Sequence, residues 1–158
     1  MNPALWADIT RDLDAATRYA ETAVRRAASL KAHPEDMDDD VREDREAAIG
    51  LLLHNCYGAM ESALERIIQA MDGTLPASSS YHADLIRRAQ TAIEGVRPAI
   101  ISTSTARGLQ KLRAFRHVFR HAYDGYDYDR AAENVPTAEV TVPSFCKDIR
   151  EFGQAIAG

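Results

Sequence analysis

One stretch of the chain combines arginines and histidines in a pattern that could bind and cleave a phosphodiester. Between residues 112 and 122 every polar side chain is a cation or an imidazole, namely Arg113, Arg116, His117, Arg120 and His121. On an α-helix, where each residue turns about 100°, these residues share one side. The opposite side is apolar and holds Leu112, Phe115, Val118, Phe119 and Ala122. A surface of cations and imidazoles suits phosphate binding and proton transfer.

This stretch is positively charged, although the chain as a whole is negatively charged. The formal net charge is -5 at pH 7, yet no Asp or Glu occurs between Glu94 and Asp124. An acidic protein does not attract nucleic acid through its overall field, so RNA binding would have to depend on this local patch.

The rest of the sequence predicts the helices that must position this patch. Glycine and proline are sparse, and apolar residues recur at steps of three and four. We expect an all-α protein, an up-and-down bundle of about five helices over residues 3–31, 38–71, 80–94, 104–123 and 144–157. Pro136 and Pro143 bracket the strand-like residues 135–142, which we expect to form an extended loop. The length of 158 residues predicts a single domain, 1–158.

The sequence also indicates where the protein is located in the cell and which state its two cysteines adopt. The first residues lack the basic and long apolar regions of a secretory signal, and no apolar run approaches the ~20 residues of a membrane span. We therefore expect a cytoplasmic protein that has no contact with a membrane. Cys56 and Cys146 are expected to be two buried free thiols in a reducing environment.

The basic stretch also resembles a known motif. Arg116-x4-His121-x-Tyr123 is similar to the R-x4-H-x-Y motif of the HepT-like toxins, a branch of the HEPN superfamily of small all-helical ribonucleases. The resemblance covers roughly residues 50 to 130 in the same order and spacing. Its other segments are Tyr57-Gly-Ala-Met-Glu61, Asp72-Gly73-x-x-Pro76, Tyr81-His82-Ala-Asp84-Leu85-Ile86 and Val96-Arg97-Pro98. Tyr81 stands where that group has Trp.

The resemblance implies a HEPN-like bundle that forms a homodimer, with a metal-independent ribonuclease site where two motifs meet and with no cofactor. It implies RNA, for example tRNA or mRNA, as the substrate. It also implies a minimal nucleotidyltransferase antitoxin as partner, which silences the toxin by AMPylation of the motif tyrosine. Carried over to this chain, Arg116 and His121 are the catalytic pair and Tyr123 is the candidate for modification.

The chemistry suits these residue types. Metal-free RNA cleavage needs a base for the 2′-hydroxyl, an acid for the leaving oxygen and a cation for the phosphorane; imidazole suits the first two and guanidinium the third. On one ideal helix, however, Arg116 and His121 point about 140° apart. A composite site, built where two such helices meet in a dimer, removes this difficulty, as does a helix that loosens near His121. Tyr123 falls within about 20° of Arg116, two turns further along, at the border of the basic face.

Several neighbouring residues allow two interpretations. Arg113, His117 and Arg120 are candidates for RNA binding or ordinary surface residues, and Glu61 either orients Arg116 or forms a structural pair. Glu61 and Glu65, one turn apart, could do acid–base work, be solvated, or be neutralised by an arginine such as Arg66. His117 and His121 have the i, i+4 spacing of a zinc site, but the surrounding arginines would repel a cation, so no metal site is predicted.

Three functions therefore compete. The first is the HepT-like endoribonuclease toxin. The second is a non-catalytic HEPN module that binds a nucleotidyltransferase partner or a nucleotide through the same basic face. The third is an interaction bundle whose Arg/His face binds an acidic protein. Substitution of Arg116 and His121 separates the three, because only the first loses RNA cleavage.

Overall fold

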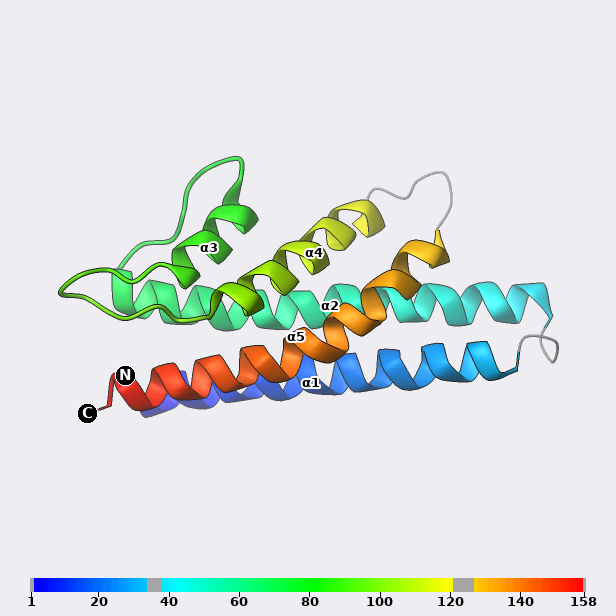
Figure 1. Cartoon of the computed structure of the whole chain (residues 1–158), viewed down its shortest axis with the longest axis horizontal. Helices are drawn as coiled ribbons and strands as arrows, with labels where there is room; N and C mark the ends of the chain where they lie inside the picture. The colour runs from blue at the N-terminus through cyan, green and yellow to red at the C-terminus, as the bar shows by residue number, and fades with distance from the viewer. Residues whose placement is uncertain (1, 34–37, 121–126, 158) are drawn as a thin grey trace.

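A computed structural model describes residues 2–33, 38–120 and 127–157, with the backbone alone at 117–120. Over these ranges the chain forms five helices and no strand: α1 (Pro3–Ala32), α2 (Asp39–Asp72), α3 (Tyr81–Gln90), α4 (Thr103–Arg120) and α5 (Tyr128–Ala155). Figure 1 shows α1 and α2 as two long antiparallel helices, with α5 running diagonally from α1 towards α4. The predicted all-α bundle is confirmed.

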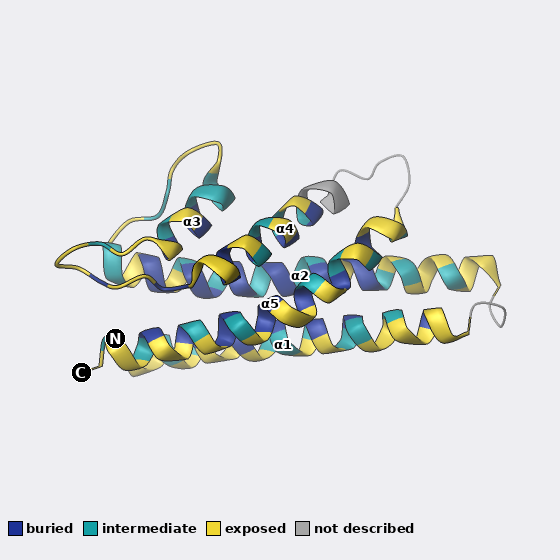
Figure 2. Cartoon of the chain, viewed as in Figure 1, coloured by how far each residue is buried: buried dark blue, intermediate teal, exposed yellow. Residues whose placement is uncertain are grey.

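The bundle is built around α2. This helix has 34 residues and packs against each of the other four. Its buried side comprises Ile49, Leu53, Cys56, Tyr57, Met60, Leu64, Ile67 and Ile68, together with the carboxylate of Glu61. Figure 2 shows how the buried faces of all the helices meet around it. A polar side chain on this inner side of α2 is therefore placed within reach of several other helices.

Capping residues stabilise two of the helix ends. Gly73 ends α2 with a left-handed φ of 75°, and its N–H donates to the carbonyl of Gln69. Ser102 caps the start of α4, since its Oγ accepts from the N–H of Thr105 at 3.3 Å. The predicted motif helix is confirmed as far as Arg120, and its predicted end at residue 123 lies outside the described residues.

Residues 135–142 are helical, so the expected extended loop is wrong. Pro136 and Pro143 lie inside α5, seven residues apart and both exposed, so they share the solvent side of the helix. A proline inside a helix costs ~3 kcal/mol, whereas burying one Val or Phe stabilises by about 1.5–3 kcal/mol. Burial wins because α5 buries a long heptad-like series: Ala131, Val135, Ala138, Val142, Phe145, Ile149 and Phe152.

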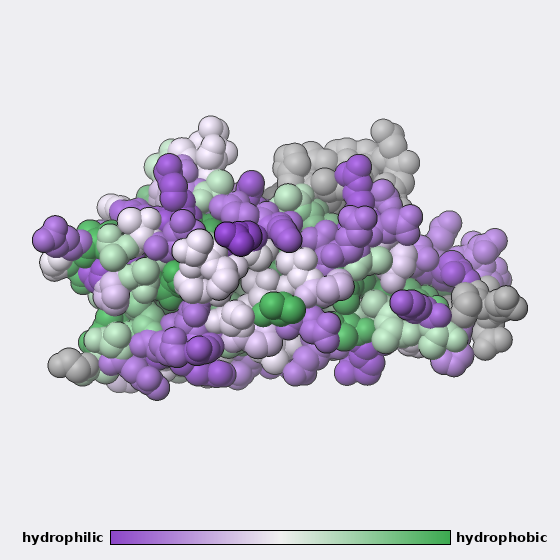
Figure 3. Space-filling model, viewed as in Figure 1, coloured by the Kyte–Doolittle hydropathy of each residue, from purple (hydrophilic) through white to green (hydrophobic). Residues whose placement is uncertain are grey.

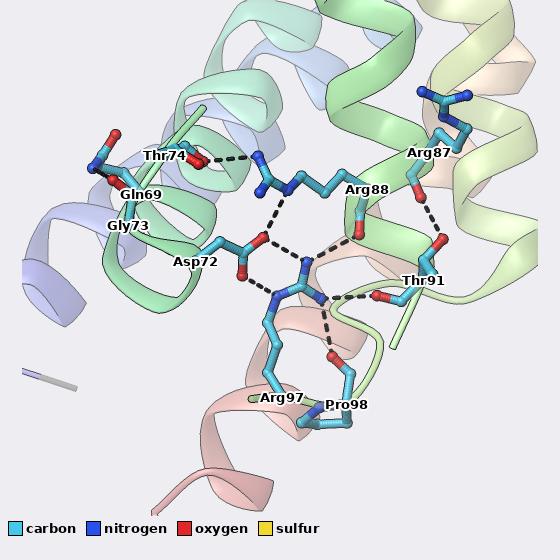
Figure 4. A network of polar contacts seen from close by, with 9 residues as sticks. All are labelled: Gln69, Asp72, Gly73, Thr74, Arg87, Arg88, Thr91, Arg97 and Pro98. Carbon is cyan, nitrogen blue, oxygen red and sulfur yellow. Dashed lines mark hydrogen bonds and ion pairs between the residues drawn. The ribbon is translucent and has the colours of Figure 1, made fainter. Parts of the chain in front are cut away.

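The third helix ends at Gln90 rather than at residue 94, because Arg97 binds its last carbonyls. The fully buried Arg97 side chain donates to the carbonyls of Arg88 and Thr91, and to both oxygens of Asp72 at 2.6 and 3.0 Å (Figure 4). Arg88 Nε binds the same carboxylate at 2.9 Å. A buried ion pair persists when hydrogen bonds satisfy it in this way. The network fastens the end of α3 to the end of α2.

The described residues include few large exposed apolar side chains. Figure 3 shows hydrophilic side chains over most of one face, with small apolar areas among them. Among the described residues the large exposed apolar side chains are Val41, Leu51, Val96 and Val140, on α2, the α3–α4 connection and α5. None of the helices in the described ranges combines the length and apolarity that crossing a bilayer requires.

Candidate functional site

Arg116 projects from α4 towards α2 and α3 and is largely withdrawn from solvent. Its side chain is 18% exposed, and its Cζ lies 5.7 Å from the centroid of the Tyr57 ring, a cation–π distance. Its Nη2 lies 3.9 Å from Oε1 of Glu61, so the two residues form an ion pair. The structure thus brings together the predicted catalytic arginine and the predicted supporting carboxylate.

The Glu61 carboxylate is the hub of this site. Its Oε2 accepts a hydrogen bond from the Tyr57 hydroxyl at 2.8 Å and contacts Nδ1 of His82 at 2.6 Å. A carboxylate that is only 9% exposed needs such partners, because a buried charge without them is very unfavourable. Burial raises the pKa of Tyr57, and the charge and hydrogen bond of Glu61 raise it further, so the phenol remains a donor.

Glu65, one turn further along α2, binds the residue next to His82 in a similar way. The Tyr81 hydroxyl donates to Oε1 of Glu65 at 2.6 Å, and the Tyr81 ring meets the His82 ring edge-on at 5.4 Å between centroids. Burial and the Glu65 hydrogen bond raise the pKa of Tyr81. Two adjacent residues at the start of α3 are therefore held by two glutamates on α2.

Arg66 does not neutralise this glutamate pair, so that interpretation is wrong. Its Nε binds Oδ2 of Asp12 at 2.8 Å and its Nη1 lies 3.7 Å from Asp8, both on α1. Arg66 follows Glu65 directly, and one residue turns a helix by about 100°, which directs the two side chains to different neighbours.

His82 also belongs to this site, although its role was not predicted from the sequence. It lies 21 residues after Glu61 and 34 before Arg116, yet its Nδ1 reaches Glu61 and its Nε2 lies 3.2 Å from Nη1 of Arg116. Only the packing of α3 across α2 creates these contacts. A signal was present in the sequence: two glutamates one turn apart match two adjacent side chains, Tyr81 and His82, that can bind carboxylates.

The structure describes only some of the other predicted site residues. Arg113 is half-buried, and its Nε donates to Oε1 of Gln110 at 2.8 Å on the same helix. His117 and Arg120 belong to α4, but their side chains are not described, and His121 and Tyr123 lie outside the described residues. The roles assigned to these residues remain predictions.

The cysteines take no part in this site. Cys56 and Cys146 are free and buried, as predicted. Burial raises the pKa of the Cys56 thiol to about 12, and it also raises the pKa of Cys146. Neither thiol is therefore activated as a nucleophile. Across the residues that the structure describes, no three His, Cys, Asp or Glu side chains gather as they would around a metal ion.

Together these side chains provide three chemical capacities at the junction of α2, α3 and α4. Arg116 offers a guanidinium for an anion, His82 offers an imidazole for a proton, and Glu61 orients both. In the sequence, Arg116 directly precedes His117, where the remaining residues of the basic stretch begin.

The comparisons with known proteins identify the family of the chain. A family model described as HepT-like protein matches residues 48–156, which include Glu61, His82 and Arg116. No curated protein and no solved structure matches the chain. Because the family model covers more than half of the chain, the protein belongs to the HepT-like family.

Proposed function

We propose that this HepT-like protein is a metal-independent endoribonuclease toxin, paired with a minimal nucleotidyltransferase antitoxin that silences it by AMPylation of Tyr123. Membership of the family supports the toxin class. The observation that carries the proposal is the position of Arg116, whose guanidinium is held beside an imidazole and a carboxylate. An arginine placed in this way is suited to bind an RNA phosphate next to groups that can move protons.

In the proposed mechanism Arg116 binds the scissile phosphate and stabilises the charge of the phosphorane. His121 performs proton transfer, and Arg113, His117 and Arg120 hold the flanking RNA. Two copies of the motif form the site across a homodimer, which resolves the angle of about 140° between Arg116 and His121 on one helix. AMP on Tyr123 would then stand at the border of the basic face and obstruct the RNA.

The test is cleavage of a labelled tRNA pool in EDTA by protein made without any nucleotidyltransferase, with the intact mass of each sample recorded. Wild type should cleave, and Arg116→Ala and His121→Ala should each lose roughly 10²–10⁴-fold in rate. Arg107→Ala is the matched control, because Arg107 is an exposed arginine on the same helix. It should cleave like wild type.

Three other outcomes have distinct meanings. Wild type that is inactive and heavier by AMP would mean that a nucleotidyltransferase of the expression host had silenced it. Inactivity at the unmodified mass would instead favour a non-catalytic module that binds a nucleotidyltransferase or a nucleotide. Equal cleavage by wild type and Arg116→Ala would refute the assigned site.

A further inference from the structure

His82 lies in a line of hydrogen bonds that fixes which of its nitrogens carries the proton. Nε2 lies 3.2 Å from Nη1 of Arg116, and a guanidinium can only donate, so Nε2 is the acceptor. Nδ1 must then carry the proton and donate it to Glu61 at 2.6 Å. The imidazole is therefore neutral, and its lone pair points at the cation that is proposed to bind phosphate.

The ring is held in this orientation from two helices. Glu61 on α2 fixes Nδ1, and Tyr81 packs edge-on against the ring while its hydroxyl is bound to Glu65. The side chain of His82 is 38% exposed, whereas that of Glu61 is 9% exposed. The imidazole thus spans from a buried carboxylate to the solvent edge of the site, where a substrate could reach it.

We propose that His82 is the general base of the reaction, a catalytic residue additional to Arg116 and His121; this inference rests on the proposed ribonuclease function. When Arg116 turns its Nη1 to a phosphate oxygen, Nε2 of His82 loses its donor and lies free beside that phosphate. Glu61 stabilises the imidazolium that forms when Nε2 takes a proton.

The step balances without a cofactor. The proton of the 2′-hydroxyl moves to Nε2 of His82 as O2′ bonds to phosphorus. The bond from phosphorus to O5′ breaks, and O5′ takes a proton from His121 acting as the acid. The products are a 2′,3′-cyclic phosphate and a 5′-hydroxyl. After the step His82 carries the additional proton and His121 is neutral, the reverse of their starting states.

The test compares two RNA substrates, one with the ordinary 5′-oxygen leaving group and one with a bridging 5′-sulfur. A thiolate leaves without being protonated, so the sulfur substrate needs the base but no acid. His82→Gln should lose roughly 10²–10⁴-fold in cleavage of both substrates. His121→Ala should lose activity on the oxygen substrate and regain it on the sulfur substrate. His33→Gln, at an exposed histidine beyond the end of α1, is the matched control and should cleave both normally.

Binding separates a base from a residue that merely holds Arg116. His82→Gln should bind a 2′-deoxy analogue of the substrate as well as wild type does. Weaker binding in proportion to the lost rate would overturn the assignment, as would recovery of His82→Gln on the sulfur substrate. His82→Asn, which can still donate to Glu61, repeats the test if the glutamine variant does not fold.

The failure of this inference and the failure of the proposed function look different. If unmodified wild type cleaves neither RNA, both fall. If wild type cleaves and His82→Gln cleaves equally well, only the role of His82 falls.

Discussion

At the residue scale, the hydroxyl of Tyr57 provides one of the two short hydrogen bonds that hold the buried Glu61 carboxylate. Tyr57→Phe should keep the ring beneath Arg116 but remove this donor. A buried charge that loses a hydrogen bond costs about 1–3 kcal/mol, so we expect the free energy of unfolding at pH 7 to fall by about that amount. Urea unfolding followed by circular dichroism measures it, and an unchanged midpoint would contradict the placement of Glu61.

The same hydroxyl predicts a pH dependence. Tyrosine in an unfolded chain ionises near pH 10, and burial raises the pKa of Tyr57 in the folded protein. The folded state therefore holds the phenolic proton more tightly, and this contribution to stability is complete below about pH 10 and is lost as the pH rises further. Between about pH 9 and 11.5 the unfolding free energy of wild type should fall more steeply than that of Tyr57→Phe. Parallel curves would contradict the raised pKa.

At this scale the sequence pointed to Arg116 and to Glu61 as a candidate partner for it, but not to His82, which contacts both residues. Arg116 drew attention through the resemblance of the basic stretch to the R-x4-H-x-Y motif, and the segment around Glu61 was part of the same resemblance. The role of His82 depends on how α3 packs across α2, which periodicity along one helix does not reveal.

At the element scale, Gly108 allows α4 and α5 to approach closely. A Cβ added there would lie 2.1 Å from Oγ1 of Thr141, a buried side chain of α5. Although Ala is ordinarily favoured over Gly in a helix by about 1 kcal/mol, we expect Gly108→Ala to destabilise by about 1–3 kcal/mol through overpacking.

Gly58 provides the matched control for this prediction. It lies in α2, and an added Cβ meets no heavy atom within 4 Å. Gly58→Ala should therefore raise the melting temperature while Gly108→Ala lowers it, as measured by thermal denaturation. The same sign for both variants would show that helix propensity, rather than the α4–α5 contact, decides stability at residue 108.

The predicted helix bounds were correct where local sequence signals agreed with the tertiary packing. They were wrong where tertiary packing outweighed those local signals. Gly73 ends α2 and Ser102 begins α4, and both are residue types that commonly occupy those positions. The prolines of α5 argued locally for a loop, but a long buried stripe on the opposite side outweighed them. The end of α3 was misplaced because Arg97, which terminates it, comes from beyond the helix.

At the scale of the whole molecule, the all-α bundle followed from composition and periodicity, whereas a composite site across a homodimer is a further prediction. It is tested by mixing Arg116→Ala with His121→Ala under conditions in which subunits exchange. If Arg116 of one protomer works with His121 of its partner, random pairing should restore on the order of a quarter of wild-type cleavage, because half of the dimers are mixed and each has one intact site.

The two variants measured separately, at the same total concentration, are the control for this mixture. Each should remain inactive. A mixture as inactive as its components would instead mean that both residues act within one protomer.

The line from Glu61 through His82 to Arg116 also constrains how this sequence can change over generations. Each residue comes from a different helix and satisfies a polar group that burial would otherwise make unfavourable, so loss of one makes the other two harmful. Lineages that lose the proposed ribonuclease activity should therefore lose all three together. Asp72 and Arg97, which hold the end of α3 to α2, should persist in the same lineages, because the fold still needs them.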